Sequence, residues 1–203
     1  MSKEKFQMVA PNIERRVFDA SELRVERRGE GDAPTIVGYA ALFDTLSENL
    51  GGFREKIDRG AFAKSLQGDV RALINHDANL VLGRTNAGTL RLTEDERGLS
   101  IEIDPPDTTF AKDLMTTIER GDISQQSFGF RTIKDAWETV EEGPDIRTLV
   151  EVELFDIGPV TFPAYPDTAV AVRSLEAWQE QQIPTGPDPA IEIHRRRMQR
   201  LAV

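Results

Sequence analysis

The first candidate for acid–base chemistry in this sequence is the one histidine of its predicted folded part. His76 is the second-last residue of the segment VRALINHD (70–77), and the only other histidine is His194. Side chains of a strand alternate between two faces, so Val70, Ala72, Ile74 and His76 are predicted to share an apolar face. His76 is therefore expected to point inward, as a general base or, alternatively, as a core histidine bonded to a backbone carbonyl.

A carboxylate occupies an apolar position in the segment VEVELFDIG. Alternation places Asp156 with Val152 and Leu154, whereas Glu153 falls on the polar face. Such a carboxylate needs a cation or a hydrogen-bond donor, and an imidazole N–H is one. Asp156 is the candidate partner of the histidine, and a structural pair with an arginine is the alternative. A bulge at Phe155 would bring Glu153 inward, so Glu153 is the reserve candidate.

The candidate nucleophile is a serine, because the chain has no cysteine. Ser124 and Ser127 both lie in GDISQQSFGF. After Ser127, Gly129 would let a substrate approach closely, and the flanking phenylalanines would keep the site dry. Ser127 is therefore preferred. Ser124, nearer the preceding helix, is typical of a turn and is the reserve.

Composition restricts the other possible chemistries. The 203 residues carry a formal net charge of −10, which disfavours a nucleic-acid partner. With two histidines and no cysteine, no metal site and no cofactor are expected. No apolar run could span a bilayer and no secretion signal is visible, so neither a membrane partner nor secretion is expected. A carboxylate-based or magnesium hydrolase is a minor alternative, since EDER and EEGPD resemble solvated turns.

The segments predict a mainly β, α+β domain. Short strand-like pieces between residues 35 and 106 are followed by longer ones at 126–140 and 147–162. Helices are expected at 107–121 and 167–182, and a short one near Arg59. A closed or nearly closed antiparallel β-barrel surrounded by helices would hide the edges of so many strands.

Composition also divides the chain. Residues 1–16 are charged and aperiodic and are predicted to form a loose arm, and 17–182 to form the folded domain. The proline-rich IPTGPDP then begins a linker and basic tail, 183–203.

Five segments in order carry a family resemblance: IVGYAALFD, FREKIDRGAFAKSL, LINHD with LGRT, RGDISQQSFGF, and LFDIGPVTFPAYPDTAV. Together they resemble the prohead maturation protease family of tailed phages over roughly residues 17–175. That family is similar to the herpesvirus protease assemblin. The resemblance implies a compact β-barrel with surrounding helices.

The resemblance also implies a catalytic triad. His76 matches the family's histidine, Ser127 matches the serine of a Ser-x-Gly-Phe motif, and Asp156 fills the place of the acidic residue. The sequence departs from the family in two ways: the acid is often glutamate, and Gly158 stands where serine is common.

Oxyanion stabilisation in such an enzyme needs hydrogen-bond donors. Backbone N–H groups near Phe128 and Gly129 are the expected donors. Arg84 could add its positive charge, and an ordinary salt bridge is the alternative for that residue.

The function implied by the resemblance is that of a serine endopeptidase inside the immature phage capsid, in the host cytoplasm. It would cut the scaffolding segment from the major capsid protein and digest itself. Herpesvirus relatives suggest a homodimer, and the tail 184–203 is a candidate packaging or self-cleavage segment. The alternative is a non-catalytic internal scaffold, which should tolerate loss of the Ser127 hydroxyl.

Overall fold

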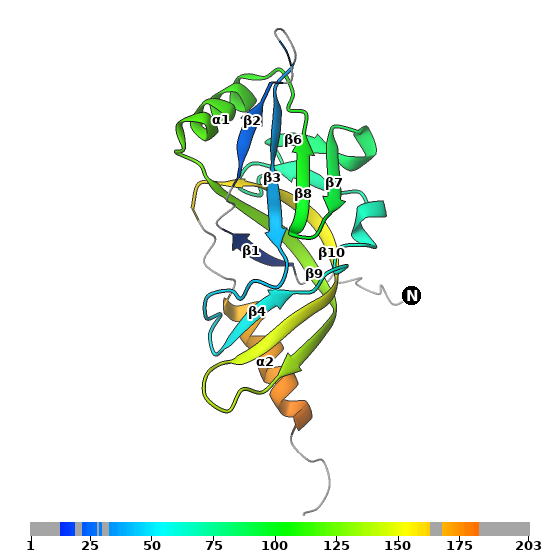
Figure 1. Cartoon of the computed structure of the whole chain (residues 1–203), viewed down its shortest axis with the longest axis vertical. Helices are drawn as coiled ribbons and strands as arrows, with labels where there is room; N and C mark the ends of the chain where they lie inside the picture. Colours follow the sequence, from blue (N-terminus) through cyan, green and yellow to red (C-terminus); the bar gives the residue numbers. More distant parts are fainter. Residues whose placement is uncertain (1–12, 19–21, 28, 30–32, 163–167, 183–203) are drawn as a thin grey trace, which may run out of the picture.

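The computed structural model describes residues 13–18, 22–27, 29, 33–162 and 168–182, whose strands form two sheets (Figure 1). The six-stranded sheet contains, in spatial order, β1 (Glu14–Phe18), β9 (Gln125–Glu138), β10 (Asp145–Val160), β5 (Arg71–Leu73) and β6 (Val81–Arg84), with β4 (Phe53–Ile57) also paired to β10. The four-stranded sheet contains β2 (Arg24–Glu26), β3 (Thr35–Leu42), β8 (Gly98–Ile103) and β7 (Leu90–Glu94).

A long hairpin of β9 and β10 organises the larger sheet (Figure 1). On one side of β10, β4 pairs in parallel with residues 145–149 and β5 in parallel with residues 156–157. On the other side lies β9, and residues 126–130 of β9 pair in turn with β1, which is antiparallel to it. The part of β9 that contains Ser127 is therefore an interior strand of the sheet.

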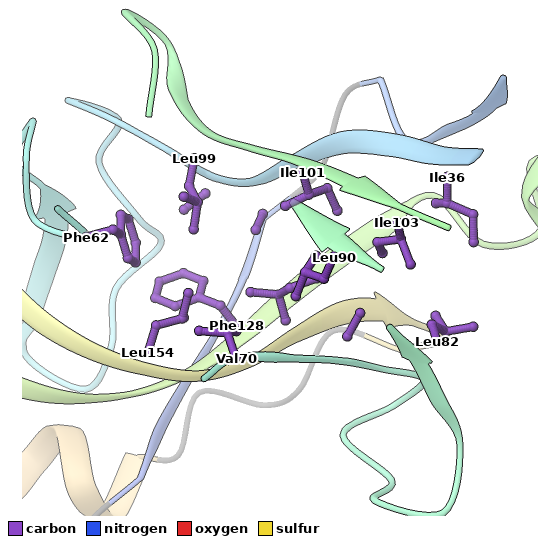
Figure 2. Close-up of a cluster of buried hydrophobic side chains, with 14 of the residues drawn as sticks. Ile36, Phe62, Val70, Leu82, Leu90, Leu99, Ile101, Ile103, Phe128 and Leu154 are labelled. Carbon is purple, nitrogen blue, oxygen red and sulfur yellow. The ribbon is translucent and has the colours of Figure 1, made fainter. Parts of the chain in front are cut away.

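The hydrophobic core lies between the two sheets. Figure 2 shows Ile36, Leu99 and Ile101 of the smaller sheet facing Phe128 and Leu154 of the larger one. All five side chains are 4% exposed or less. One face of β9 and β10 is therefore buried against the smaller sheet, and the opposite face is available for a functional site.

The structure confirms the two longer helices that the sequence predicted. α1 (Thr109–Arg120) ends at Gly121, whose φ of 81° suits a residue without a side chain. α2 (Thr168–Gln182) packs beside the end of the β9–β10 hairpin, where Trp178 stacks on Trp137 with ring centroids 5.1 Å apart. The short helix expected near Arg59 is replaced by turns and the 3₁₀ helix η1 (Ser65–Gln67).

The mainly β, α+β class is confirmed, but the predicted closed or nearly closed barrel is wrong. The described strands form two separate sheets, and no pairing joins one sheet to the other. β6 and β7 follow each other in sequence, yet the 3₁₀ turn η2 (Thr85–Ala87) sends them into different sheets. The two parallel pairings of β10 also depart from the expected antiparallel arrangement, because they join strands far apart in sequence and leave no tight-turn signal.

Buried charges hold β1 in the larger sheet. The Arg16 guanidinium binds Glu55 and Glu14, each at 2.8 Å, and Arg147 binds the same two carboxylates at 3.0 and 2.8 Å. Burial alone would raise the pKa of the Glu14 carboxyl, but Arg147 and Arg16 outweigh burial and hold this pKa below its usual value. The predicted loose arm over residues 1–16 is thus wrong for its last three residues. Their partners come from distant strands that the local sequence does not reveal.

The predicted linker and basic tail, 183–203, lie outside the described residues. The division of the chain into arm, domain and tail otherwise stays a prediction.

Candidate active site

Three side chains that are far apart in sequence form one hydrogen-bonded chain. Nε2 of His76 lies 2.7 Å from Oγ of Ser127, and Nδ1 of the same ring is hydrogen-bonded to Oδ1 of Asp156. The structure therefore brings together the three residues that the sequence singled out. A hydroxyl, an imidazole and a carboxylate in this order are the groups of a serine-hydrolase triad.

Ser127 lies on the face of β9 opposite the core. Its neighbour Phe128 and the next alternate residue, Phe130, both point into the core. Side chains alternate along a strand, so Ser127 and Gly129 point to the other face. The two phenylalanines were expected to keep the site dry. They instead pack in the core on the opposite face of β9, with their rings stacked at a centroid distance of 4.9 Å.

A β-bulge at Phe155 places Asp156 beside Ser127. Leu154 pairs with Phe130 on the core face, but Asp156 pairs with Gly129, so Phe155 is an extra residue on β10. The prediction that Asp156 shares a face with Leu154 is therefore wrong, because the bulge shifts the alternation by one residue.

The bulge does not bring Glu153 inward. Glu153 stays on the solvent side in an ion pair with Arg131, and both side chains are more than 40% exposed. The reserve acid is thus spatially separate from the hydrogen-bonded chain. Ser124, the reserve serine, is exposed in the loop before β9.

Gly129 makes room for the carboxylate. A Cβ atom at this position would lie only 2.6 Å from Oδ2 of Asp156. The glycine that was predicted to let a substrate approach closely instead leaves room for the Asp156 carboxylate against β9.

His76 reaches Ser127 from a turn and not from a strand. β5 ends at Leu73, and both Asn75 and His76 have left-handed backbones, with φ values of 51° and 58°. Val70, Ala72 and Ile74 do belong to the core. The prediction that His76 extends their face is wrong, because the left-handed turn directs its ring to the opposite side of the sheet.

Gly158 allows this turn to cross over β10. It pairs with Ser127, and a Cβ atom on Gly158 would lie 1.7 Å from the carbonyl oxygen of Leu73. No side chain fits unless the backbone moves. Gly158 is therefore what lets the segment carrying His76 pass directly over the partner residue of Ser127.

The hydrogen-bonded chain is largely shielded from water. Ser127 is 0% exposed, and the side chains of His76 and Asp156 are 10% and 12% exposed. Electrostatic interactions are stronger in such an environment than in water. The site is therefore suited to holding one imidazole orientation and to stabilising charge on the ring.

The expected oxyanion donors are engaged elsewhere. Phe128 and Gly129 pair with β1 on one side and β10 on the other. Strand N–H groups lie in the plane of the sheet, so these two do not point to the face that carries the Ser127 hydroxyl.

Arg84 lies on β6, which is separated from β9 by β10 and β5 in the order of the sheet. Its guanidinium makes two hydrogen bonds of 2.6 Å to Asp69, and its side chain is 45% exposed. This is the ordinary salt bridge that the sequence left open as the alternative.

Within the described ranges, no group of three or more histidine, aspartate or glutamate side chains is arranged to hold a metal ion. No helix in the same part of the chain is both long and apolar enough to cross a membrane.

Comparisons with known proteins agree with this fold. A search of curated proteins gave no match. Among solved structures, the bacteriophage T4 capsid assembly protease, gp21, matches with a TM-score of 0.51 and 11% sequence identity, over 74% of this chain and 98% of that one. The model of the caudovirus prohead serine protease family matches residues 21–181, which is most of the chain. This protein therefore belongs to the caudovirus prohead serine protease family.

Proposed function

We propose that this protein is a serine endopeptidase in which Ser127 is the nucleophile, His76 the general base and Asp156 the residue that orients the base. The observation that carries the proposal is the continuous hydrogen-bonded chain from the Ser127 hydroxyl through the imidazole to the carboxylate. Membership of a serine protease family supports it independently.

Each group has a defined role in this reaction. Nε2 of His76 takes the proton from Oγ of Ser127 as the oxygen attacks the scissile carbonyl, and then gives it to the leaving amine. Asp156 accepts a hydrogen bond from Nδ1, which keeps Nε2 free to act as the base and stabilises the imidazolium. Water then hydrolyses the acyl-enzyme by the same proton transfers in reverse.

The substrate we propose is the major capsid protein, cut to release its scaffolding segment inside the prohead, with self-cleavage in addition. The family membership and the fold shared with a capsid assembly protease support this assignment. Ser127 has no exposed surface, so a peptide carbonyl reaches Oγ only after part of the surrounding structure moves. Confinement in a prohead would raise the local concentration of substrate and so favour binding of the peptide to the enzyme.

An alkyl fluorophosphonate tests the nucleophile without requiring a known cleavage site. Activated serine should displace fluoride and become phosphonylated, and peptide mapping by mass spectrometry should place the label on Ser127. Ser127→Ala and His76→Gln variants should remain unlabelled, while Ser124→Ala should label like wild type. Undiminished labelling of Ser127→Ala would contradict the proposal.

A further inference from the structure

The turn that carries His76 is fastened to the strand paired with the nucleophile. The backbone N–H of Asn75 donates to the carbonyl of Pro159 at 3.0 Å. Pro159 directly follows Gly158, and Gly158 pairs with Ser127 across the β9–β10 ladder. The position of His76 relative to Ser127 thus depends on how the turn is attached to this end of β10.

The side chain of Asn75 makes a two-point attachment to the same segment. Its Oδ1 accepts a hydrogen bond from the backbone N–H of Thr161 at 2.8 Å, and its Nδ2 donates to Oγ1 of Thr161 at 3.2 Å. An amide is suited to this arrangement because it offers an acceptor and a donor side by side.

The backbone of the turn needs such support. Two consecutive non-glycine residues, Asn75 and His76, have positive φ values, a conformation that is costly for most L-residues and best tolerated by asparagine, aspartate and histidine. Strained conformations persist only where surrounding contacts hold them. The backbone bonds from Ile74 to Leu80, from Asp77 to Ile74 and from Leu80 to Asp77 close the turn internally and do not connect it to β10.

We propose that Asn75 is a positioning residue that holds the imidazole of His76 in line with Ser127 and Asp156 by anchoring the turn to Thr161. The inference rests on the proposed function of the triad. Asn75 does not touch the reacting atoms and acts only through the location of the residue that follows it. Misplacement of a catalytic group by about 1 Å can lower a rate by roughly a hundredfold.

The test uses the full chain and an alkyl fluorophosphonate, with the maximal labelling rate separated from the apparent affinity of the probe. Asn75→Gly tolerates a positive φ but removes both side-chain bonds. We expect its maximal labelling rate to fall roughly tenfold to a hundredfold, with probe affinity within about twofold of wild type. Asn75→Asp keeps the acceptor for the Thr161 N–H and should recover part of the rate.

Two further variants separate positioning from general stability. Thr161→Val removes only the hydroxyl that accepts from Asn75, and should lower the rate in the same direction but less. Asn79→Gly is the matched control, because Asn79 lies in the same turn and its side chain, among the residues that the structure describes, bonds to Asp77 and not to β10. Its labelling rate should match wild type.

Proton NMR gives a readout that a loss of stability would not move. The Nδ1–H of His76, which bonds to Asp156, should give a far-downfield signal that is present in wild type and Asn79→Gly and weakened in Asn75→Gly. Wild-type labelling and an unchanged signal in Asn75→Gly would overturn the inference, as would a rate loss that merely follows a lower melting temperature. Labelling of Ser127→Ala at the wild-type rate would instead refute the proposed function itself.

Discussion

Replacing Asp156 with asparagine is expected to lower the rate of peptide cleavage about 10⁴-fold while leaving the fold intact. An amide occupies nearly the same volume over Gly129, so the packing against β9 is kept. It carries no charge to stabilise the imidazolium, and its N–H₂ group favours the tautomer that leaves Nε2 protonated. The Ser127 hydroxyl would then have no base. Cleavage rates and circular dichroism of the purified variant measure the two parts of this expectation.

Glu153→Gln is the matched control for Asp156→Asn. Glu153 lies on the same strand and carries the same charge, but its ion pair with Arg131 is exposed and contributes about 1 kcal/mol or less to stability. The control should cleave at the wild-type rate. If Glu153→Gln were the inactive variant and Asp156→Asn the active one, the assignment of the acid would be reversed.

Replacing Gly158 with alanine should abolish measurable cleavage and destabilise the protein. The new methyl group would lie 1.7 Å from the carbonyl oxygen of Leu73, which is backbone and cannot rotate away. The segment that crosses β10 must lift, and it carries His76 with it. Overpacking of this kind typically costs about 1–3 kcal/mol, and displacement of the base removes the catalytic chain. A serine at this position would collide in the same way.

Two other glycines provide the comparison for Gly158→Ala. The added Cβ of Gly129→Ala would lie nearest the side-chain carboxylate of Asp156, at 2.6 Å and not nearest backbone, so this variant should lower activity with a smaller loss of stability. Gly88→Ala meets no atom within 4 Å and should cost only the strain of a φ of 71°, about 1–2 kcal/mol, without loss of activity. Chemical denaturation and the cleavage assay distinguish the three variants. Wild-type cleavage by Gly158→Ala would contradict the role given to the crossing.

The types of the catalytic candidates were predictable from sequence, but their placement was not. The single histidine of the predicted folded domain and a carboxylate at an apolar position indicated His76 and Asp156. The faces that these two side chains occupy depend on the β-bulge at Phe155 and on the left-handed backbone conformation of Asn75 and His76. A prediction from strand alternation takes neither feature into account. Alternation singled out two residues that the structure places beside Ser127, but it predicted the wrong face of the sheet for both.

Long-range pairing accounts for the rest of what the sequence did not reveal. Helix α1 was predictable because its apolar spacing and the terminating Gly121 are local signals. The parallel pairing of β5 with β10 joins segments about 85 residues apart, and it is this pairing that brings the turn to Ser127. The bond between Asn75 and Thr161 likewise spans 86 residues, so only the known tolerance of asparagine for positive φ could have drawn attention to Asn75.

The most direct test of the proposed peptidase is co-expression with the major capsid protein of the same phage, comparing wild type with Ser127→Ala by intact mass. We predict a shortened capsid protein with wild type and a full-length one with the variant, the mass difference locating the cut. Equal cleavage by both would remove Ser127 as the nucleophile and contradict the account. Proheads that form normally with no cleavage by either would favour a scaffold without catalytic function.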